Sequence, residues 1–154
     1  MVQPSHFRVQ FGPNRFQQFQ LPVVDRIAND AGSTGTLNLG NGAGPGLINT
    51  PSIHGGAGTA KLNINHNASD YFLTSDGTNG GSAINLTGSL ELNHLGSGTT
   101  TLTGANTHSG DTNVMAGVLR IGSANALSPN STLNVSNGAQ FKANGHAVAF
   151  ARGC

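Results

Sequence analysis

Short runs of alternating apolar and polar residues dominate the chain from residue 32 onward. A period of two places successive side chains on opposite faces of a β-strand, so each run predicts a strand. The intervening segments, such as GNGAGPG, SDGTNGG and LGSG, have the composition of turns. The runs are GTLNLGNG (35–42), TAKLNINHN (59–67), SAINLTGSLELN (82–93), GTTTLTG (98–104), TNVMAGVLRIG (112–122), STLNVSNG (131–138) and AQFKANG (139–145). No stretch beyond residue 32 has helical spacing, and the body of the chain is therefore predicted to be all-β.

Paired aliphatic residues within these runs form the predicted core. The pairs are Leu37/Leu39, Leu62/Ile64, Ile84/Leu86, Leu90/Leu92, Leu119/Ile121, Leu133/Val135 and Ala139/Phe141. Strands with only two inward residues bury too little surface alone, and a β-sandwich would require longer strands and more aromatic residues. Trp is absent and Tyr71 is the only tyrosine. Stacked coils solve this problem, because each coil adds a few aliphatic residues to one continuous core.

The coil architecture also accounts for the 18 Asn of the chain, which can stack at successive turns. With ~20 residues per coil and ~4.8 Å between strands, about 120 residues give roughly six coils and a rod about 30 Å long. The sequence therefore predicts a right-handed, single-stranded parallel β-helix, a solenoid.

A change of composition near Asn29 divides the chain into three predicted parts. Residues 1–31 contain four of the seven Phe, and we expect a short amphipathic helix from Phe16 to Asn29, interrupted by Pro22. This N-terminal segment is expected to be either a cap on the coils or a poorly ordered stretch. Residues 32–147 contain the β-helical repeats, and residues 148–154 form a tail.

Composition and charge argue against several classes of protein. Apolar residues make up 36% and charged residues 8% of the chain, against roughly 45–50% and about 25% in typical globular proteins. The net charge is +1 and no two basic residues are adjacent, so nucleic-acid binding is not expected. The single cysteine, Cys154, excludes an intrachain disulfide. No apolar run approaches the ~20 residues of a membrane helix, and residues 1–30 lack the apolar core of a secretory signal.

One segment, GSGTTTLTGANTHSGDTNVMAGVLRIG, keeps glycine, threonine and aliphatic residues at fixed spacing from Gly96 to Gly122. It resembles the autotransporter-associated β-strand repeat, G-x-G-T-x-x-L-T-G-x-N-T-Y-x-G-x-T-x-V-x-x-G-x-L-x-x-G. His108 stands where the family usually has Tyr, and Asp111 where a small residue is common. The resemblance extends over about residues 32–147. The matching positions, which we expect to be structural, are Gly96, Gly98, Thr99, Leu102, Thr103, Gly104, Asn106, Thr107, Gly110, Thr112, Val114, Gly117, Leu119 and Gly122.

The resemblance implies the passenger domain of a bacterial autotransporter, exposed on the cell surface at the outer membrane or secreted. It also implies that the intact parent has a signal peptide and a C-terminal β-barrel translocator. We expect neither within this chain, whose tail AVAFARGC does not end in an aromatic residue. The chain is therefore interpreted as a passenger fragment, and an orphan reading frame from a decayed gene is the other interpretation.

Residues suited to metal binding or cofactor binding are sparse. The histidines are at least 12 residues apart, which does not match metal-ligand spacing; they are His6, His54, His66, His94, His108 and His146. They are expected to be solvated turn residues, although stacking of coils would bring His66 and His94 together. The segment Gly55–Thr59 (GGAGT) resembles the start of a calcium-binding nonapeptide, but Ala60 occupies the position of the required Asp. We therefore expect a turn between coils there, and neither a metal nor a cofactor.

Residues suited to catalysis are equally few. The acidic residues are Asp25, Asp30, Asp70, Asp76, Glu91 and Asp111. Asp70 and Asp76 flank a turn, where a carboxylate from a neighbouring coil would complete the acid–base pair of a polysaccharide-active β-helix. The spacing selects no such pair, and none of the 13 Ser lies in a G-x-S-x-G sequence. We therefore expect no active site. The N-x-S/T sequons at Asn67, Asn85, Asn130 and Asn134 are what this composition produces by chance.

These observations predict a surface stalk or adhesin scaffold without catalysis of its own. Its polar surface would bind host-surface or glycan ligands weakly and at many points. The alternative is a polysaccharide-binding or polysaccharide-active β-helix, which requires a groove with two or more carboxylates. Unpaired strand edges at the ends of such a rod also predict self-association.

Overall fold

Ten β-strands form the regular structure of residues 24–148, the part of the chain described by a computed structural model. The strands are β1 (Val24–Ile27), β2 (Thr34–Leu39), β3 (Ser52–Ile64), β4 (Tyr71–Phe72), β5 (Asn85–His94), β6 (Thr99–Leu102), β7 (Thr112–Val114), β8 (Val118–Ile121), β9 (Leu133–Val135) and β10 (Gln140–Lys142). None of the described residues belongs to a helix long and apolar enough to cross a membrane. Each of the seven predicted runs contains a strand, which confirms the all-β prediction.

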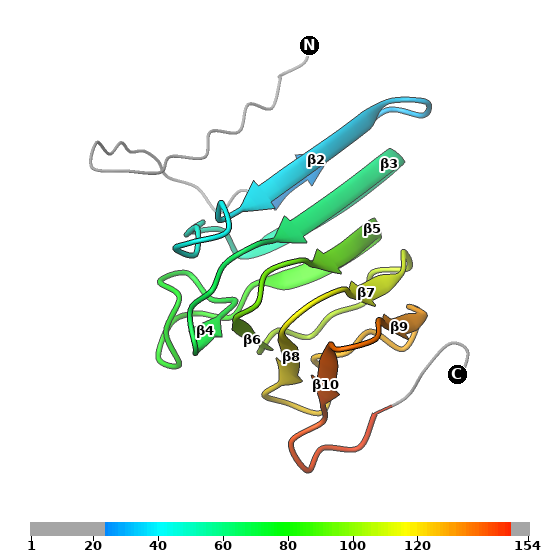
Figure 1. The fold of residues 1–154 in the computed structure, drawn as a ribbon. Helices are drawn as coiled ribbons and strands as arrows, with labels where there is room; N and C mark the ends of the chain where they lie inside the picture. The colour runs from blue at the N-terminus through cyan, green and yellow to red at the C-terminus, as the bar shows by residue number, and fades with distance from the viewer. Residues whose placement is uncertain (1–23, 149–154) are drawn as a thin grey trace.

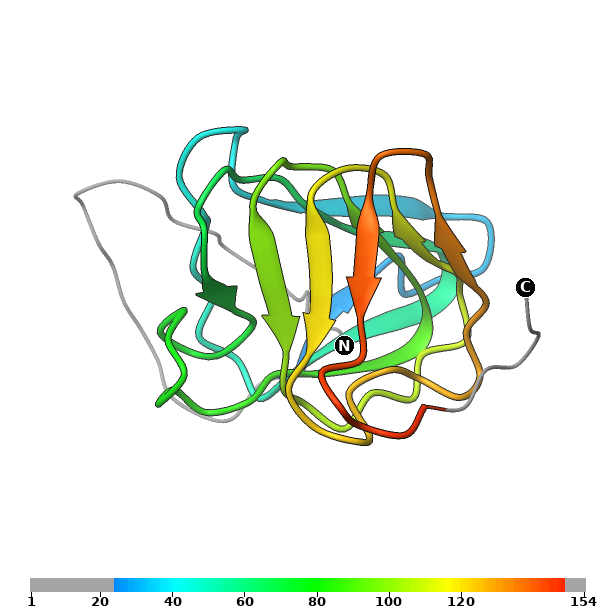
Figure 2. The same ribbon diagram turned by 60° about the horizontal axis from the view of Figure 1, so that its bottom comes forward.

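The strands form two parallel sheets on opposite sides of the core (Figure 1). In the first sheet, here called the ladder sheet, the order is β1-β3-β5-β7-β9, and β2 also pairs with β3. The second sheet has the order β10-β8-β6-β4. From β3 onward the chain alternates between the two sheets, and each return places a strand beside the previous one in parallel register. Figure 2 shows the strands of the second sheet side by side, in the order β4, β6, β8 and β10. The arrangement confirms the predicted parallel β-helix.

The coils differ in length more than the sequence suggested. Residues that stack on successive strands of the ladder sheet are 25, 30, 20 and 21 positions apart in the sequence. The ladder sheet therefore has five stacked levels in the described residues, where roughly six were predicted, because the first two coils are long. Strands β3 and β5 have 13 and 10 residues, and both continue around a corner of the coil.

Two local expectations are wrong. The segment Gly55–Thr59 is not a turn between coils but part of β3. There the register with β5 shifts between Gly55 and Ala60, and the N–H groups of Ala57 and Gly58 donate to Asn29 and Ala28 of the coil before. The prediction of a helix from Phe16 to Asn29 is also wrong over the described residues. There, Val24–Ile27 forms strand β1 and pairs with β3. The rest of that helix lies outside the described residues.

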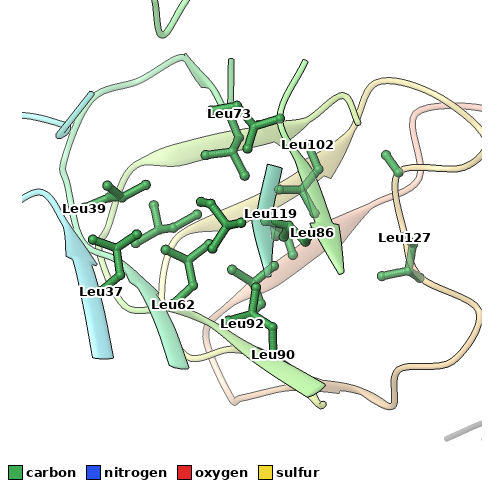
Figure 3. Close-up of a cluster of buried hydrophobic side chains, with 14 of the residues drawn as sticks. Leu37, Leu39, Leu62, Leu73, Leu86, Leu90, Leu92, Leu102, Leu119 and Leu127 are labelled. Atoms are coloured by element: carbon green, nitrogen blue, oxygen red, sulfur yellow. The ribbon is translucent and has the colours of Figure 1, made fainter. Parts of the chain in front are cut away.

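The core is a column of aliphatic side chains between the sheets (Figure 3). Leu37, Leu62 and Leu92 are stacked in register on β2, β3 and β5, and the latter two are fully buried. Complete burial of one such side chain stabilises a fold by about 1.5–3 kcal/mol. The predicted inward pairs are buried along the column. At its C-terminal end the burial is incomplete: Val135 on β9 is 44% exposed and Phe141 on β10 is partly buried.

Candidate functional site

A row of stacked asparagines crosses the outer side of the ladder sheet. From the second asparagine onward, each side chain donates from Nδ2 to Oδ1 of the asparagine one coil earlier, at distances of 2.9, 3.0, 2.8 and 2.8 Å. The row, here called the asparagine ladder, consists of Asn38, Asn63, Asn93, Asn113 and Asn134. We expected asparagines to stack at turns, but these lie within strands, between two inward residues. Each amide keeps further hydrogen-bonding capacity for solvent or a ligand.

Charged residues flank the ladder near its middle. Lys61 Nζ lies 3.2 Å from Glu91 Oε1, and the same carboxylate oxygen accepts from Nδ2 of Asn93 at 2.9 Å. The next coil places the exposed Asp111 beside Glu91, because Leu92 pairs with Thr112 and its N–H donates to the carbonyl of Asp111. The outer face of this sheet therefore carries a polar strip of amides, two neighbouring carboxylates and one amine.

The two carboxylates singled out from the sequence, Asp70 and Asp76, bond to different parts of the molecule. Asp70 forms an ion pair with Arg120, whose Nε also donates to Thr101 Oγ1 at 2.8 Å on the second sheet. Asp76 instead closes its own turn by accepting from the N–H and the hydroxyl of Thr78, both at 2.9 Å. These hydrogen bonds hold the pKa of Asp76 below its usual value. The structure thus gives each of these carboxylates a separate structural partner.

The motif glycines lie where one coil passes closest to another. A Cβ built on Gly98 would lie 2.3 Å from the carbonyl O of Ala68, and one on Gly117 would lie 2.3 Å from the carbonyl O of Gly98. Such distances are too short for any side chain. Both glycines also take part in hydrogen bonds between coils, since Gly98 N–H donates to the carbonyl of His66 and the Gly117 carbonyl accepts from Gln140 N–H. Gly96, Gly104 and Gly110 are equally crowded by the preceding coil, and Gly122 less so.

The other motif residues belong to the core or to contacts between coils. Leu102, Val114 and Leu119 are fully buried. Asn106, 2% exposed, links three coils: its Oδ1 accepts from Leu86 N–H at 2.8 Å, and its Nδ2 donates to the carbonyl of Ala126 at 2.6 Å. Of the motif threonines, Thr112 is buried, Thr99 and Thr103 are partly buried and Thr107 is exposed.

Two of the histidines meet inside the rod at a single hydroxyl. Thr100 Oγ1 lies 2.8 Å from Nε2 of His66 and 2.9 Å from Nε2 of His94. The two imidazole rings are nearly perpendicular, and their centroids are 5.9 Å apart. The rings of Tyr71 and His66 are in an edge-type contact, with their centroids 5.0 Å apart. The set His66, Thr100 and His94 is here called the Thr100 network. The expected approach of the two histidines is found, but their expected exposure is wrong, because both are 0% exposed.

Hydrogen-bond partners determine the proton positions in this network. His94 Nδ1 lies 2.9 Å from the carbonyl O of Ala116, so Nδ1 carries the proton and Nε2 accepts from the Thr100 hydroxyl. His66 Nε2 then donates to Thr100 Oγ1, and His66 Nδ1 accepts from the N–H of Ala68 at 3.1 Å. With both rings neutral, every nitrogen has a suitable partner. A further proton on His66 Nδ1 would face the N–H of Ala68, and one on His94 Nε2 would leave the Thr100 hydroxyl without its acceptor.

Burial favours the same neutral state. It lowers the pKa of His66 to about 4, with a smaller contribution from the nearby His94. The pKa of His94 is lowered mainly by burial as well, against an opposing hydrogen bond to the Ala116 carbonyl. Burial raises the pKa of Tyr71 to about 12, and its hydroxyl donates to the carbonyl of Gly46 at 2.9 Å. All three rings are therefore uncharged near neutral pH.

His108 occupies a second buried polar position. It is 0% exposed, and its Nε2 lies 3.0 Å from Thr112 Oγ1, which lies 2.7 Å from Ser131 Oγ. Its Nδ1 has no hydrogen-bond partner among the described residues. We place the proton on Nε2, since an unpaired buried lone pair costs less than an unpaired N–H. Burial lowers the pKa of His108 to about 4. This residue too is a core histidine and not the solvated one expected.

Metal binding has no support in the described residues, which include no group of three or more His, Cys, Asp or Glu close enough to hold an ion. His54 bonds to Thr87 Oγ1 through Nδ1 at 3.0 Å, and His146 is partly buried. His6 and Cys154 lie outside the described residues.

A comparison with known protein families identifies a repeat in the middle of this region. Residues 92–121 match the family model of the passenger-associated-transport-repeat. The match spans the end of β5 to the end of β8 and overlaps the segment whose resemblance was noted above. That segment is an autotransporter passenger repeat. No curated protein and no solved structure matches the chain.

Proposed function

We propose that this chain is a structural segment of an autotransporter passenger, a β-helical stalk or adhesin scaffold with no catalysis of its own. The observation that carries the proposal is the unbroken column of the core beneath the asparagine ladder, with the passenger repeat at its centre. Such a rod holds its form through contacts between neighbouring coils, and it can therefore project other parts of a protein away from a membrane. In the intact parent, the segment would stand at the cell surface or be secreted.

Passage to the surface is the first property to test. The full chain is displayed on bacteria between an outer-membrane anchor and a reporter domain, and external protease measures how much reporter is exposed. Surface exposure of the reporter is expected for the natural sequence and for Gly44→Ala, a glycine with open space around it. Gly98→Val should remain inside or be degraded, because its side chain prevents coil contact. Retention of the natural chain inside the cell would refute the proposal.

Adhesion in this proposal arises from many weak contacts along the polar strip. Beads coated densely with the chain should then bind host glycoproteins, while single soluble chains should not, since multivalency multiplies weak affinities. Substituting the exposed ladder residues Asn38 and Asn134 by Ala should reduce bead binding without loss of the far-ultraviolet circular dichroism spectrum. Binding that is equal for dense and sparse beads would contradict the multivalent mode.

A second candidate, action on a polysaccharide, is favoured by one feature, the neighbouring carboxylates of Glu91 and Asp111. Glu91 is engaged by Lys61 and Asn93, which suits a structural or binding role better than proton transfer. A panel of polysaccharides assayed for new reducing ends distinguishes the two. Turnover that disappears in Glu91→Gln and in Asp111→Asn would replace the scaffold proposal.

A further inference from the structure

Four asparagines of the chain precede a glycine, a pair that is chemically labile. They are Asn41, Asn79, Asn137 and Asn144. The backbone N of the following residue can attack the asparagine Cγ and close a five-membered ring. Glycine gives that N the most freedom to approach, because it has no Cβ. The attack requires a backbone N–H whose proton is free to leave and a turn with room for the ring, and the four pairs differ on both points.

The first two pairs are held by hydrogen bonds. Gly42 N–H donates to the carbonyl of Asn65 at 2.8 Å, and the side-chain Oδ1 of the same pair accepts from the N–H of Ala43 at 3.1 Å. Gly80 N–H donates to Thr78 Oγ1 at 3.2 Å. A backbone N–H in a hydrogen bond is held away from the neighbouring carboxamide and retains its proton. Ring closure is therefore opposed in both pairs, and most strongly in the first.

The last two pairs have no such contacts. Asn137 and Asn144 are exposed, and among the described residues neither their side chains nor the N–H groups of Gly138 and Gly145 have a hydrogen-bond partner. A Cβ built on either glycine would meet no heavy atom within 4 Å. Each pair occupies the middle of a four-residue turn that is closed by one hydrogen bond of 2.9 Å between the flanking residues. Both turns thus leave space for the ring and a free proton to lose.

We propose that Asn137 and Asn144 are sites of spontaneous deamidation in the folded protein, and that the fold protects Asn41 and Asn79. At each site the glycine N bonds to the asparagine Cγ and the Cγ–Nδ2 bond breaks. Nδ2 leaves as ammonia with the proton that the glycine N–H gives up. Water then opens the succinimide ring. Cleavage at Cγ yields aspartate, and cleavage at the main-chain carbonyl yields isoaspartate, whose backbone is one carbon longer.

Deamidation changes the charge at one end of the described coils. Asn137 follows β9 and Asn144 follows β10, which are the last strands of the two sheets. Each conversion adds one negative charge, so two conversions change the net charge of the chain from +1 to −1. The charge of this end therefore changes with the age of the protein, without any enzyme.

Peptide mapping of the aged chain tests this inference. Trypsin cleaves after Lys and Arg and places the four pairs in separate peptides, residues 27–61, 62–120, 121–142 and 143–152. The folded full chain is sampled over time in mildly alkaline buffer, and each conversion raises the mass of a peptide by about 1 Da. Peptides 121–142 and 143–152 should gain this mass several-fold faster than the other two. In concentrated urea, with loss of structure checked by circular dichroism, all four should convert at similar rates.

The matched control is Asn137→Gln, in which closure would need a less favourable six-membered ring. Peptide 121–142 of this variant should keep its mass, which assigns the change to Asn137 and not to the other asparagines of that peptide. The inference is overturned if peptides 121–142 and 143–152 keep their mass in the folded chain. It is also overturned if the Asn41 peptide converts as fast as they do, or if the variant peptide still gains mass. None of these results bears on surface display, so this inference can fail while the proposed scaffold function stands.

Discussion

Mild acidification should destabilise this protein while most of its carboxylates are still ionised. His66 and His108 are neutral in the folded chain with pKa values of about 4, while in the unfolded chain they take up protons below about pH 6.5. The unfolded state therefore binds more protons between these values. Stability is complete above about pH 6.5, decreases as the pH falls toward 4, and levels off below it.

The expected loss is large compared with the usual stability of a domain. One histidine with these two pKa values lowers the free energy of unfolding by about 2 kcal/mol at about pH 5, so two lower it by about 4 kcal/mol. His94, whose pKa is also lowered, adds in the same direction. Folded domains have only about 5–15 kcal/mol of stability in total. A shift from neutral pH to about pH 5 should therefore remove a substantial part of it.

Urea denaturation followed by circular dichroism between about pH 7.5 and about pH 5 measures this loss, in a range where most carboxylates stay ionised. The matched variant is His108→Gln, which removes one titrating ring and should reduce the pH dependence by about 2 kcal/mol. Its stability at neutral pH is also lower, because the Nε2 contact with Thr112 is changed. A free energy of unfolding that does not change with pH over this range would mean that these histidines do not have lowered pKa values in the folded chain. An unchanged pH dependence in His108→Gln would mean the same for His108.

Three substitutions test the contacts between coils. Leu92→Ala should lower the free energy of unfolding by about 2–5 kcal/mol in urea denaturation, since a fully buried side chain leaves a cavity, and a loss below 1 kcal/mol would contradict its place in the core. Gly104→Val should abolish a cooperative unfolding transition, because its Cβ would lie 2.3 Å from the carbonyl O of Ile84; a normal thermal melt would count against that close approach. Asn93→Ala should lower the free energy of unfolding by about 1–3 kcal/mol in urea denaturation, more than Asn38→Ala at the end of the ladder. Equal losses in the two variants would mean that the ladder contributes no cooperative stabilisation.

Much of the architecture could be predicted from local pattern. Leu62 and Ile64, or Leu90 and Leu92, point inward because a strand has a period of two, and the turn residues between runs mark where each coil bends. The family resemblance located the repeat at Gly96–Gly122, and the matched family model agrees with it. What local pattern does not contain is coil length, which depends on how far β3 and β5 continue around a corner.

The buried polar contacts were missed for a related reason. Histidine is a common surface residue, and nothing adjacent to His66 in the sequence indicates that Thr100, 34 positions away, will satisfy it. Once the register between coils is known, however, the contact between His66 and Thr100 can be predicted. The ladder had a readable signal, an Asn between two inward positions in each coil, as in Leu62-Asn63-Ile64 and Thr112-Asn113-Val114. Aligning these triplets would have supplied the register and the coil lengths together.

Cross-linking between coils shows whether residues of successive coils stack in parallel register. Asn93 and Asn113 are register partners on β5 and β7, and neighbouring strands about 4.8 Å apart lie within the range of Cα separations that a disulfide spans. With Cys154 replaced by Ser, the pair Asn93→Cys and Asn113→Cys should close quantitatively under mild oxidation. The pair Asn93→Cys and Asp111→Cys, on the same face but out of register, should stay reduced. Closure of the second pair instead of the first would contradict the parallel stacking of β5 and β7.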